Sequence, residues 1–471
     1  MHGHTVILDV GKSWTKASLW TAEGRCLERR THPNARVRSA DGLRALDVEG
    51  IESWLCETLS ALASRGVIEA IVPVAHGAGA AILRDGALLA PPLDYEQPID
   101  AGLLAGYEAE RDSFRFTGSP RLPDGLNLGA QLHFLEACRP GCLAQATLVT
   151  WAQYWAWSLC GIAATEVTSL GCHTDLWLPG KGRFSDLAVR RGWDRCFAPL
   201  RRAHEVLGTL TPSWSQRTGL LPTVRVHCGL HDSNAALLAA RGFEPLRDCE
   251  ATVLSTGTWF VAMRSTGDPV TPEALPQQRD CLMNVDVQGR PVPSARFMGG
   301  REIETLLGQD TPPIDGLRCQ CADATLADAV ASAQPPLPGY APGCGPFPAA
   351  QGQWPDRPAD PSQRQRLIAL YAALVADASM DLLGVRERVL VEGRFSGCAP
   401  FVSALAALRP GTRFYTASAD CDASFGALRL VHPSVAPAGS LTPAIPLERD
   451  LRSIRNRWRE RIAQAPATAG K

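Results

Sequence analysis

A carboxylate near the middle of the chain is the first residue with an evident chemical use. Asp232 lies in residues 229–236, directly after the β-type run 223–226 and before a small-residue helical pattern that reaches about Ala240. A carboxylate at the junction of a strand and a helix can face a cleft instead of filling a core. Because such a group can accept a proton from a bound substrate, we predict that Asp232 is a general base.

A second group of polar residues lies near the start of the chain, in a strand, glycine turn and strand pattern over residues 5–20. Around the turn glycine Gly11 this segment holds Asp9, Lys12, Ser13, Thr15 and Lys16. Backbone N–H groups of a glycine turn can converge on an anion, hydroxyl and ammonium groups add donors, and an aspartate can hold Mg²⁺ through water. Taken alone, the segment fits an anion-binding turn and an ordinary polar hairpin equally.

A second copy of this pattern favours the anion-binding interpretation. Residues 251–263 repeat the order of apolar strand, polar residue, glycine turn and strand, with the turn at Ser255-Thr256-Gly257-Thr258-Trp259. The two copies stand at the heads of the two halves of the chain, and the second follows the Asp232 segment. Such a duplication suggests two anion-binding turns that face each other across an interdomain cleft.

Length and composition limit the classes of protein. A chain of 471 residues exceeds what one hydrophobic core usually serves, so we expect two domains. The net charge of −1, without a basic block in either half, excludes the electrostatic footprint of a nucleic-acid-binding protein. The longest apolar stretch, residues 367–383, carries Asp377 and Asp381 four apart, which indicates a packed amphipathic helix and not a membrane span.

The remaining patterns predict an α/β fold in which short strands alternate with helices. We expect helices at 50–63, 126–138, 150–160, 367–383 and 447–462, and strands at 68–75 and 388–393. The aromatic helix, 151–159, is best explained by core packing, although one ring could stack on a sugar. The Pro- and Gly-rich tract 335–361 is a long irregular loop, equally a mobile lid or plain surface. The fifteen cysteines and a start that leads directly into a strand, without a signal peptide, fit a reducing cytoplasm.

Together these motifs resemble the FGGY carbohydrate kinases, members of the actin, Hsp70 and sugar kinase superfamily, over residues 5–431. The resemblance rests on Asp9-x-Gly11 with Lys16, on Leu159-Cys160-Gly161 with residues 166–168, on Gly229-x-His231-Asp232, on residues 255–259, on residues 392–396 and on Ala423-x-x-Gly426-Ala427. Three features depart from the family pattern. Glu392 replaces a glycine of the adenosine motif, Cys160 replaces a threonine, and the acidic Gly-Glu-Arg loop is missing.

The resemblance implies two RNase H-like domains hinged over a cleft: residues 1–225 on the sugar side, residues 226–446 on the nucleotide side, and a C-terminal helix and tail at 447–471. It also implies that Asp232 is the base and that Asp9 holds Mg²⁺ through water. The implied ATP contacts are Gly11, Ser13, Thr15, Lys16, Thr256, Gly257, Thr258, Gly393, Arg394 and Ser396. The implied sugar contacts are His76, Gly77, Tyr95, Glu96, His173, Asp175 and Asn234; for His76 a turn or cap role is the alternative.

The function implied is an ATP- and Mg²⁺-dependent phosphoryl transfer to a primary hydroxyl of a ketose. The turn at 255–259 is closest to that of L-fuculose and L-rhamnulose kinases, which favours a 6-deoxy-ketohexose. A kinase for xylulose, ribulose or glycerol is the alternative, and a sugar or nucleotide sensor without catalysis is a third hypothesis, motivated by Glu392. The expected partners are the sugar and ATP, with neither nucleic acid nor membrane, and a homodimer is the assembly considered.

Overall fold

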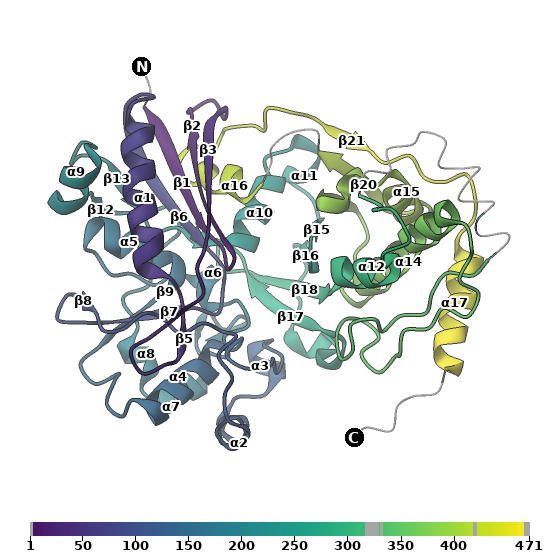
Figure 1. Cartoon of the computed structure of the whole chain (residues 1–471), viewed down its shortest axis with the longest axis horizontal. Coiled ribbons are helices and arrows are strands. Elements are labelled where there is room, and N and C mark those ends of the chain that lie inside the picture. Colours follow the sequence, from purple (N-terminus) through teal and green to yellow (C-terminus); the bar gives the residue numbers. More distant parts are fainter. Residues whose placement is uncertain (1–2, 316–328, 330–332, 418–421, 466–471) are drawn as a thin grey trace.

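Two sheet-centred halves stand side by side, with a pair of helices between them (Figure 1). The computed structural model describes residues 3–315, 329, 333–417 and 422–465. Each half contains one large mixed sheet, and the order of strands in the first is repeated in the second. This repetition confirms the predicted α/β class with two similar halves.

The first sheet has the order β12-β13-β6-β1-β2-β3, and β14 pairs with β6. Its strands are β1 (His4–Val10), β2 (Trp14–Trp20), β3 (Cys26–Pro33), β6 (Ile68–Ala75), β12 (Val206–Thr209), β13 (Arg225–His227) and β14 (Leu230–His231). The strands β1, β2 and β3 form an antiparallel meander, whereas β6 runs parallel to β1, β13 and β14. The carboxyl ends of β1, β6 and β14 therefore meet at one edge, where Asp9 and Asp232 lie.

The second sheet has the order β17-β18-β16-β15-β19-β20-β21. Its strands are β15 (Ala251–Thr256), β16 (Phe260–Ser265), β17 (Cys281–Val285), β18 (Pro291–Phe297), β19 (Arg388–Gly393), β20 (Arg413–Ala417) and β21 (Leu441–Pro443). The hairpin β15–β16 occupies the place of β1–β2, and β19 runs parallel to β15 as β6 does to β1. The long crossover helices also correspond, because α1 (Val48–Ala63) precedes β6 and α14 (Pro361–Leu382) precedes β19.

The two central helices are α10 (Asp232–Ala240) and α16 (Ala423–Val431). They approach so closely that a Cβ on Gly426 would stand 1.7 Å from the backbone oxygen of Ala235. Their apolar side chains join Ile7 and Val72 of the first sheet with Val253 and Leu390 of the second in one buried cluster. This cluster ties the two halves together.

The predicted domain division at residue 225 needs a small correction. The strands β13 and β14 still belong to the first sheet, so the first half continues to His231. In addition, α16 comes from the second part of the chain but packs against β1 and β6. The boundary is therefore set by the two central helices, and not by one point in the sequence.

The other elements form smaller layers around these sheets. The remaining helices of the first half are α2 (Ala101–Glu110), α3 (Phe114–Thr117), α4 (Leu128–Cys138), α5 (Trp151–Cys160), α6 (Val167–Leu170), α7 (Asp186–Arg190), α8 (Trp193–Cys196) and α9 (Pro212–Thr218). Those of the second half are α11 (Glu244–Arg247), α12 (Gly299–Leu307), α15 (Ala399–Leu408) and α17 (Arg452–Gln464). Short strands complete the first half: β4 (Val37–Arg38), β5 (Arg44–Ala45), β7 (Ala80–Arg84), β8 (Ala87–Leu88), β9 (Thr147–Thr150), β10 (Trp177–Leu178) and β11 (Arg183–Phe184).

The aromatic helix α5 has the core role predicted for it. Trp151 and Trp155 are buried and pack edge to face, and Tyr154 contacts both rings. The tract 335–361 is irregular apart from one bridge between Leu337 and Gln353, as predicted.

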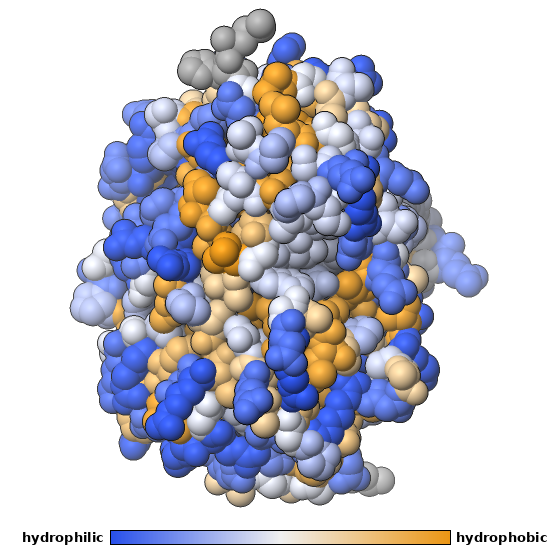
Figure 2. Space-filling model, turned by 90° about the vertical axis from the view of Figure 1, so that its left-hand side faces the viewer, coloured by the Kyte–Doolittle hydropathy of each residue, from blue (hydrophilic) through white to orange (hydrophobic). Residues whose placement is uncertain are grey.

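The described helices and cysteines bear on two features of the chain, its membrane-spanning capacity and its disulfides. No helix in the described ranges is long and apolar enough to cross a membrane. Every cysteine within those ranges is a free thiol. The face shown in Figure 2 intersperses small hydrophobic areas with hydrophilic residues.

A buried charge network fixes α17 onto α14. Asp377 on α14 is fully buried and lies within 3.0 to 3.5 Å of guanidinium nitrogens of Arg409, Arg455 and Arg459. Its neighbour Asp381 also pairs with Arg409 and Arg459. The two aspartates that argued against a membrane span therefore anchor the C-terminal helix.

Replacing Asp377 by asparagine should destabilise the protein by about 3 kcal/mol, because three arginines then lose their one fully buried carboxylate partner. Urea-induced unfolding followed by circular dichroism measures this loss. The matched control is Asp450→Asn, which removes an exposed pair with Arg452 and should leave stability close to that of the wild type. Equal effects of the two substitutions would contradict the anchoring role of Asp377.

Candidate active site

Asp232 is the first residue of α10 and follows directly on β14. Its side chain keeps 35% of its surface exposed, so the carboxylate can meet a substrate. The Oδ1 atom accepts a hydrogen bond from the Ser233 backbone N–H at 2.5 Å and lies 3.3 Å from His231 Nε2. The structure therefore places Asp232 as predicted, at a strand-to-helix junction with a free side of the carboxylate.

The backbone that carries Asp232 is held by buried neighbours. Gly229 has a φ of 78°, and a Cβ there would stand 2.0 Å from the Pro73 carbonyl oxygen of β6. Gln153 on α5 donates to the carbonyls of Cys228 and Gly229, at 3.0 and 3.2 Å. These contacts explain the glycine of the Gly-x-His-Asp segment by the close passage of two strands.

A further support comes from Glu166 and Thr168. The Thr168 hydroxyl donates to Glu166 and accepts the backbone N–H of His231 at 3.0 Å. Burial raises the pKa of Glu166 to about 7, while its bonds to Thr168 and Ser169 lower it. This segment positions the end of β14, which gives the predicted Thr-Asp-type motif a structural role.

Three carboxylates converge at this point of the structure. Burial raises the pKa of Asp9, at the end of β1, to about 7. Lys16 lowers this pKa, whereas the charges of Asp232 and Asp422 raise it. Lys16 Nζ lies 3.7 Å from Asp9, and the strand register places the two residues directly opposite. Asp422, the N-cap of α16, pairs with Arg29 of β3 at 3.0 Å. Asp422 was missed in the sequence because the resemblance assigned it no role.

This arrangement fits a Mg²⁺ ion that is held mainly by water and phosphate oxygens. Among the residues that the structure describes, no group of three or more His, Cys, Asp or Glu side chains forms a metal cage. Mg²⁺ in nucleotide-dependent enzymes usually keeps several waters and binds one or two carboxylates together with phosphates. Asp9, with its side chain 16% exposed, acidic neighbours and a raised pKa, is the residue that would hold it.

The first turn is braced by a side chain that the sequence patterns did not reveal. Asn34, just beyond β3, donates to the carbonyl of Gly11 at 2.9 Å and accepts from the Thr15 hydroxyl at 2.7 Å. Thr15 is completely buried and, next to Lys16 on β2, points to the opposite face of the sheet. The prediction that Thr15 contacts phosphate therefore needs correction, because its hydroxyl fixes the turn.

The second turn shows the same division of roles. The Thr256 hydroxyl donates to the carbonyl of Glu392 and accepts the backbone N–H of Phe395, so it links β15 to β19 and does not point to a phosphate. A Cβ on Gly300 would stand 2.2 Å from the Gly257 oxygen, which brings the start of α12 against the turn. Thr258 is exposed and remains available with the turn backbone.

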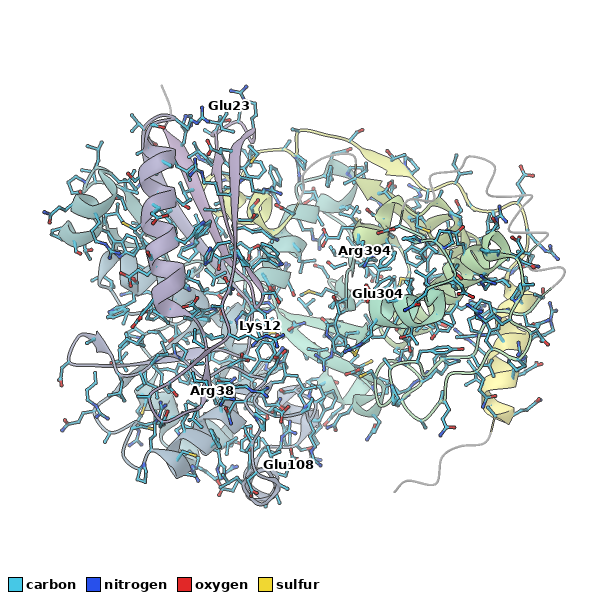
Figure 3. The ribbon with its side chains drawn as sticks, in the orientation of Figure 1. Lys12, Glu23, Arg38, Glu108, Glu304 and Arg394 are labelled. Atoms are coloured by element: carbon cyan, nitrogen blue, oxygen red, sulfur yellow. The ribbon has the colours of Figure 1, made fainter. Side chains whose placement is uncertain are left out.

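The loop after β19 departs from the expected phosphate contacts. Gly393 has a φ of 83°, and a Cβ there would stand 2.3 Å from the Thr256 oxygen, so a glycine is required. The guanidinium of Arg394 pairs with Glu304 at 2.9 Å and with Asp315 at 2.8 Å, and Figure 3 shows Arg394 close to Glu304. The Ser396 hydroxyl donates to the Gly393 carbonyl. The side chains of Arg394 and Ser396 thus shape this loop, and their predicted part in ATP binding stays a prediction.

Glu392 faces the second turn. Its carboxyl accepts a hydrogen bond from the Ser255 hydroxyl. Burial raises the pKa of Glu392 to about 7; the bond to Ser255 lowers it and the charge of Asp422 raises it. The residue that departs from the family pattern is therefore part of the same acidic group as Asp422 and Asp9.

The predicted sugar residues His76 and Gly77 follow β6 and lie next to His231. A Cβ on Gly77 would stand 2.9 Å from Cys172 Sγ and 3.1 Å from His231 Nε2, and those two atoms are 3.2 Å apart. His76 Nδ1 lies 2.5 Å from the Gly77 carbonyl oxygen, and burial lowers the pKa of this imidazole. A neutral His76 that donates through Nδ1 presents Nε2 as an acceptor.

Several buried polar atoms near this point have no protein partner in the described ranges. They are His76 Nε2, Trp151 Nε1 and His231 Nδ1. Buried polar groups are rarely left unsatisfied, so these atoms are suited to hydroxyl groups of a ligand. Trp151 packs at 6.4 Å from the His76 ring, and Tyr95 packs edge to face with that ring at 5.5 Å.

Predicted residues of both motifs border one cavity. A cavity of about 210 Å³ is lined by Gly11, Ser13, Glu96 and Trp151, together with Lys12 and Asp94. Lys12 pairs with Asp94, lies 3.9 Å from Glu96 and stands 4.6 Å from the centre of the Tyr95 ring. The first turn and the predicted sugar residues Tyr95 and Glu96 are thus neighbours.

The second half contributes a cation that sequence patterns missed. Arg296 on β18 pairs with Asp280 at 3.1 Å and lies over the ring of Trp259, 4.7 Å from its centre. Burial, together with the smaller effect of the Arg296 charge, lowers the pKa of His173 to about 3, so His173 is neutral. His173 Nδ1 bonds the carbonyl oxygen of Leu126 at 2.8 Å. Trp259 and Arg296 therefore stand near His173 from the opposite half.

Two predicted sugar contacts are corrected by the structure. Asp175 is fully buried and accepts hydrogen bonds of 2.6 Å from Tyr107 and Arg111, so its oxygens serve the packing of α2. Asn234 stands two residues after Asp232 on α10, about 200° around the helix, and its side chain lines a different cavity. This helical rotation directs the side chain of Asn234 away from that of Asp232.

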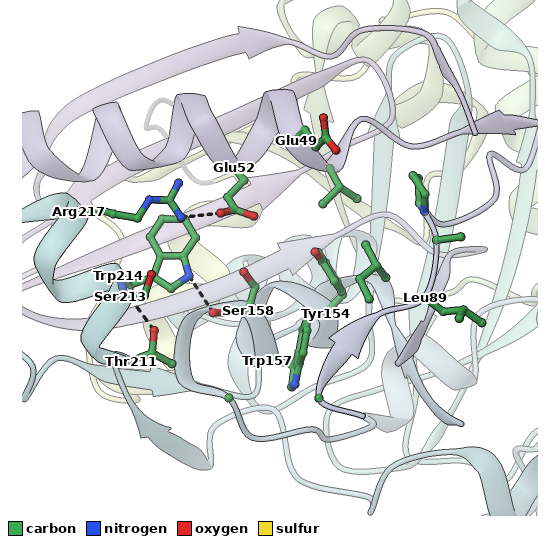
Figure 4. A pocket seen from close by; sticks show the side chains of 16 residues that line it. Glu49, Glu52, Leu89, Tyr154, Trp157, Ser158, Thr211, Ser213, Trp214 and Arg217 are labelled. Atoms are coloured by element: carbon green, nitrogen blue, oxygen red, sulfur yellow. Dashed lines mark hydrogen bonds and ion pairs between the residues drawn. The ribbon is translucent and has the colours of Figure 1, made fainter. Parts of the chain in front are cut away.

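Another cavity, of about 690 Å³, lies between α1, α5 and α9 (Figure 4). Tyr154, Trp157 and Trp214 border it together with an ion pair of 2.6 Å between Glu52 and Arg217. None of the predicted catalytic or binding residues lines this cavity. Its size alone therefore gives no reason to place the chemistry there.

The fold and the site together define a class of protein. Two halves with the same strand order, each with a glycine turn after its first strand, and a carboxylate between them are features of the actin-like superfamily of phosphotransferases and ATPases. A solved structure described as a carbohydrate kinase from Novosphingobium aromaticivorans matches with a TM-score of 0.93 and 51% identity, covering 98% of this chain and 99% of that chain. Gluconate kinase from Lactobacillus acidophilus shares the fold, with a TM-score of 0.79 at 14% identity and 98% coverage of both chains.

Sequence comparison gives the family. Residues 248–438 match the family described as carbohydrate kinase FGGY, C-terminal domain. The chain belongs to the FGGY family of carbohydrate kinases, which confirms the resemblance found in its motifs. Rhamnulokinase from Yersinia pestis is 29% identical over 257 residues, which cover 52% of this chain. The matched segment spans about half, 49%, of the length of that rhamnulokinase.

The pKa of Glu392 leads to a pH-dependent prediction. A carboxyl whose pKa is higher in the folded than in the unfolded state contributes stability below its unfolded pKa, and this contribution is lost as the pH rises through about 7. Wild-type unfolding free energy should therefore fall relative to that of Glu392→Gln between pH 5 and pH 8, by about 3 kcal/mol at most. Urea titrations of both proteins across this range measure the difference, with exposed Glu304→Gln as the control. Parallel pH curves for the wild type and Glu392→Gln would refute the prediction.

Proposed function

We propose that this protein is an ATP-dependent kinase that phosphorylates a primary hydroxyl of a ketose, with a 6-deoxy-ketohexose such as L-fuculose or L-rhamnulose as the favoured substrate. The observation that carries the proposal is the position of Asp232 at the start of α10, where its side chain is 35% exposed and its charge acts on the partly buried Asp9 at the end of β1. Membership of a carbohydrate kinase family supports it. A cytoplasmic location and a homodimer stay predictions.

In the proposed reaction Asp232 accepts the proton of the sugar hydroxyl, and the oxygen of that hydroxyl attacks the γ-phosphorus of ATP. The bond between that phosphorus and the bridging oxygen breaks, and ADP leaves. Lys16, Thr258 and the backbone N–H groups of the turns at Gly11 and Gly257 hold the phosphates. Positioning and charge neutralisation carry most of the catalysis in phosphoryl transfer. Mg²⁺ at Asp9 supplies further neutralisation of the phosphate charge.

The sugar binds, in this proposal, against the first half. His76 Nε2 accepts a hydrogen bond from one hydroxyl, and Trp151 Nε1 donates to another, since both atoms are buried without a protein partner in the described ranges. Trp259 and Arg296 approach from the second half. The similarity to a rhamnulokinase and the turn at residues 255–259 favour a 6-deoxy-ketohexose. Xylulose, ribulose and glycerol are the alternatives to be tested with it.

One observation favours a non-catalytic sensor: the acidic Glu392 lies beside the second turn, and its negative charge would repel a phosphate group there. Its protonation near neutral pH reduces that opposition. We therefore favour the kinase.

Asp232→Asn should lower kcat by about 10²- to 10⁴-fold, because the amide cannot accept the proton. Binding of ATP, measured by calorimetry, should stay within a few-fold of wild type, since the phosphate turns are unchanged. The control is Asp85→Asn, an exposed carboxylate at the turn between β7 and β8. Near-normal turnover in Asp232→Asn would remove it from the role of base.

The substrate is tested by coupled measurement of ADP release with Mg²⁺ and a panel of L-fuculose, L-rhamnulose, xylulose, ribulose, glycerol and erythritol. We expect the highest kcat/KM for one of the two 6-deoxy-ketohexoses. A higher value for a pentulose or a polyol would move the substrate assignment within the family. Absence of sugar-stimulated ADP release across a wider panel would favour the sensor.

A further inference from the structure

A cavity of about 640 Å³ lies behind α10, on the side opposite to Asp232. The α10 residues that line it are Asn234, Leu237, Leu238 and Arg241, which share one face of the helix. The opposite wall is formed by the end of β16 at Ser265 and by the turn between β17 and β18 at Arg290. These wall residues lie at the end of the second sheet away from the phosphate turn at residues 257–258. The cavity is therefore separate from the proposed catalytic site.

Asn234 is an unusual residue in the wall of this cavity. Its side chain is 2% exposed, and neither its Oδ1 nor its Nδ2 has a partner in the described parts of the chain. An unpaired buried amide costs free energy, of the order of 1–3 kcal/mol for each missing bond. A ligand in the cavity could supply a hydrogen bond to the amide N–H, and this need is a direct sign of a binding site.

Cations dominate the same cavity. Four arginines line it, at positions 241, 247, 290 and 429, against three carboxylates, at positions 248, 250 and 286. Two of these carboxylates are already neutralised, because Asp286 pairs with Arg290 at 2.7 Å and Glu250 pairs with Arg264 at 2.5 Å. Even with Arg429 left out of the count, Arg241 and Arg247 then face one remaining carboxylate, that of Asp248, so the charge of the cavity is positive.

Arg241 is the central cation of this cavity. Its guanidinium donates to the backbone carbonyls of Leu246, Arg247 and Cys249 and to the Ser265 hydroxyl, all of them uncharged groups. Burial, and the neighbouring charge of Arg290, lower its pKa, whereas Cys249, Asp286 and Asp248 raise it. A guanidinium with neutral partners in a half-buried place is stabilised by an added anion.

From these observations we infer that the cavity behind α10 is a second binding site, for the phosphate or carboxylate group of a small metabolite. The anion would contact Arg241 and the amide N–H of Asn234 from one side and the β17–β18 turn from the other. Because α10 begins with Asp232 and also joins the two halves, an occupied site would fix the helix relative to the second sheet.

The test measures anion binding with the phosphate turns already filled. The full-length protein is saturated with Mg²⁺ and a non-hydrolysable ATP analogue, and orthophosphate, glycerol phosphate or citrate is titrated by calorimetry at constant ionic strength. We expect saturable binding of at least one of these probes. The preferred probe distinguishes a phosphate group from a carboxylate group.

Two substitutions remove different parts of the site: Asn234→Leu removes the unpaired amide, and Arg241→Gln removes the charge. Each should raise the dissociation constant at least tenfold, while the control Arg195→Gln, at an exposed arginine of α8, should leave it unchanged. Thermal unfolding confirms that each variant is folded. If Arg241→Gln does not fold, the test relies on Asn234→Leu alone. Lack of binding to the wild type, or binding that persists in Asn234→Leu, would overturn the inference. Since no turnover is measured, this result is independent of the proposed kinase activity.

Discussion

The close packing of α10 against α16 is the constraint on which the site depends. Gly426 leaves no side chain between the helices, so the oxygen of Ala235 lies where a Cβ would otherwise stand. Both contact residues lie near the N-termini of their helices, and these N-termini carry Asp232 and Asp422. Helix N-termini bear partial positive charge, which favours anions. The crossing therefore brings two acidic groups and two helix dipoles to one place, next to the end of β1.

Burial and, to a smaller extent, this convergence disfavour the charged form of Asp9, and a nearby cation can offset that cost. The pKa of Asp9, about 7 where an exposed aspartate has 3.8, means that ionising it near neutral pH costs about 4 kcal/mol more than in water. Lys16 offsets part of this cost from the opposite strand. A Mg²⁺ ion with its waters would offset more, and phosphate would in turn be attracted to the ion. The acidic group is thus suited to bind metal and nucleotide together better than either alone.

The same structure separates residues that hold the site from residues that can meet a ligand. Thr15, Thr256, Asp175, Arg394 and Ser396 have their polar groups engaged within the protein. His76, Trp151 and His231 retain buried polar atoms without partners in the described ranges. Hydrogen-bonded side chains give rigidity to the turns, whereas unpaired ones supply selectivity, and the family motifs mix the two kinds. Positions next to each other in a motif can therefore differ completely in function.

The sequence by itself determined the local elements and the type of chemistry. Alternating patterns and glycine turns predicted β1–β2, β15–β16, β6 and β19, because hydrogen bonding and side-chain periodicity act over a few residues. They also identified Asp9 and Asp232 as the carboxylates of interest. The folded chain reveals that Asn34 braces the first turn, that the charge of Asp422 acts on Asp9, and that Arg296 lies close enough to His173 to lower its pKa. It also decided that Asn234 faces away from Asp232. These contacts join residues up to several hundred positions apart, and their geometry follows from how two sheets pack on one pair of helices.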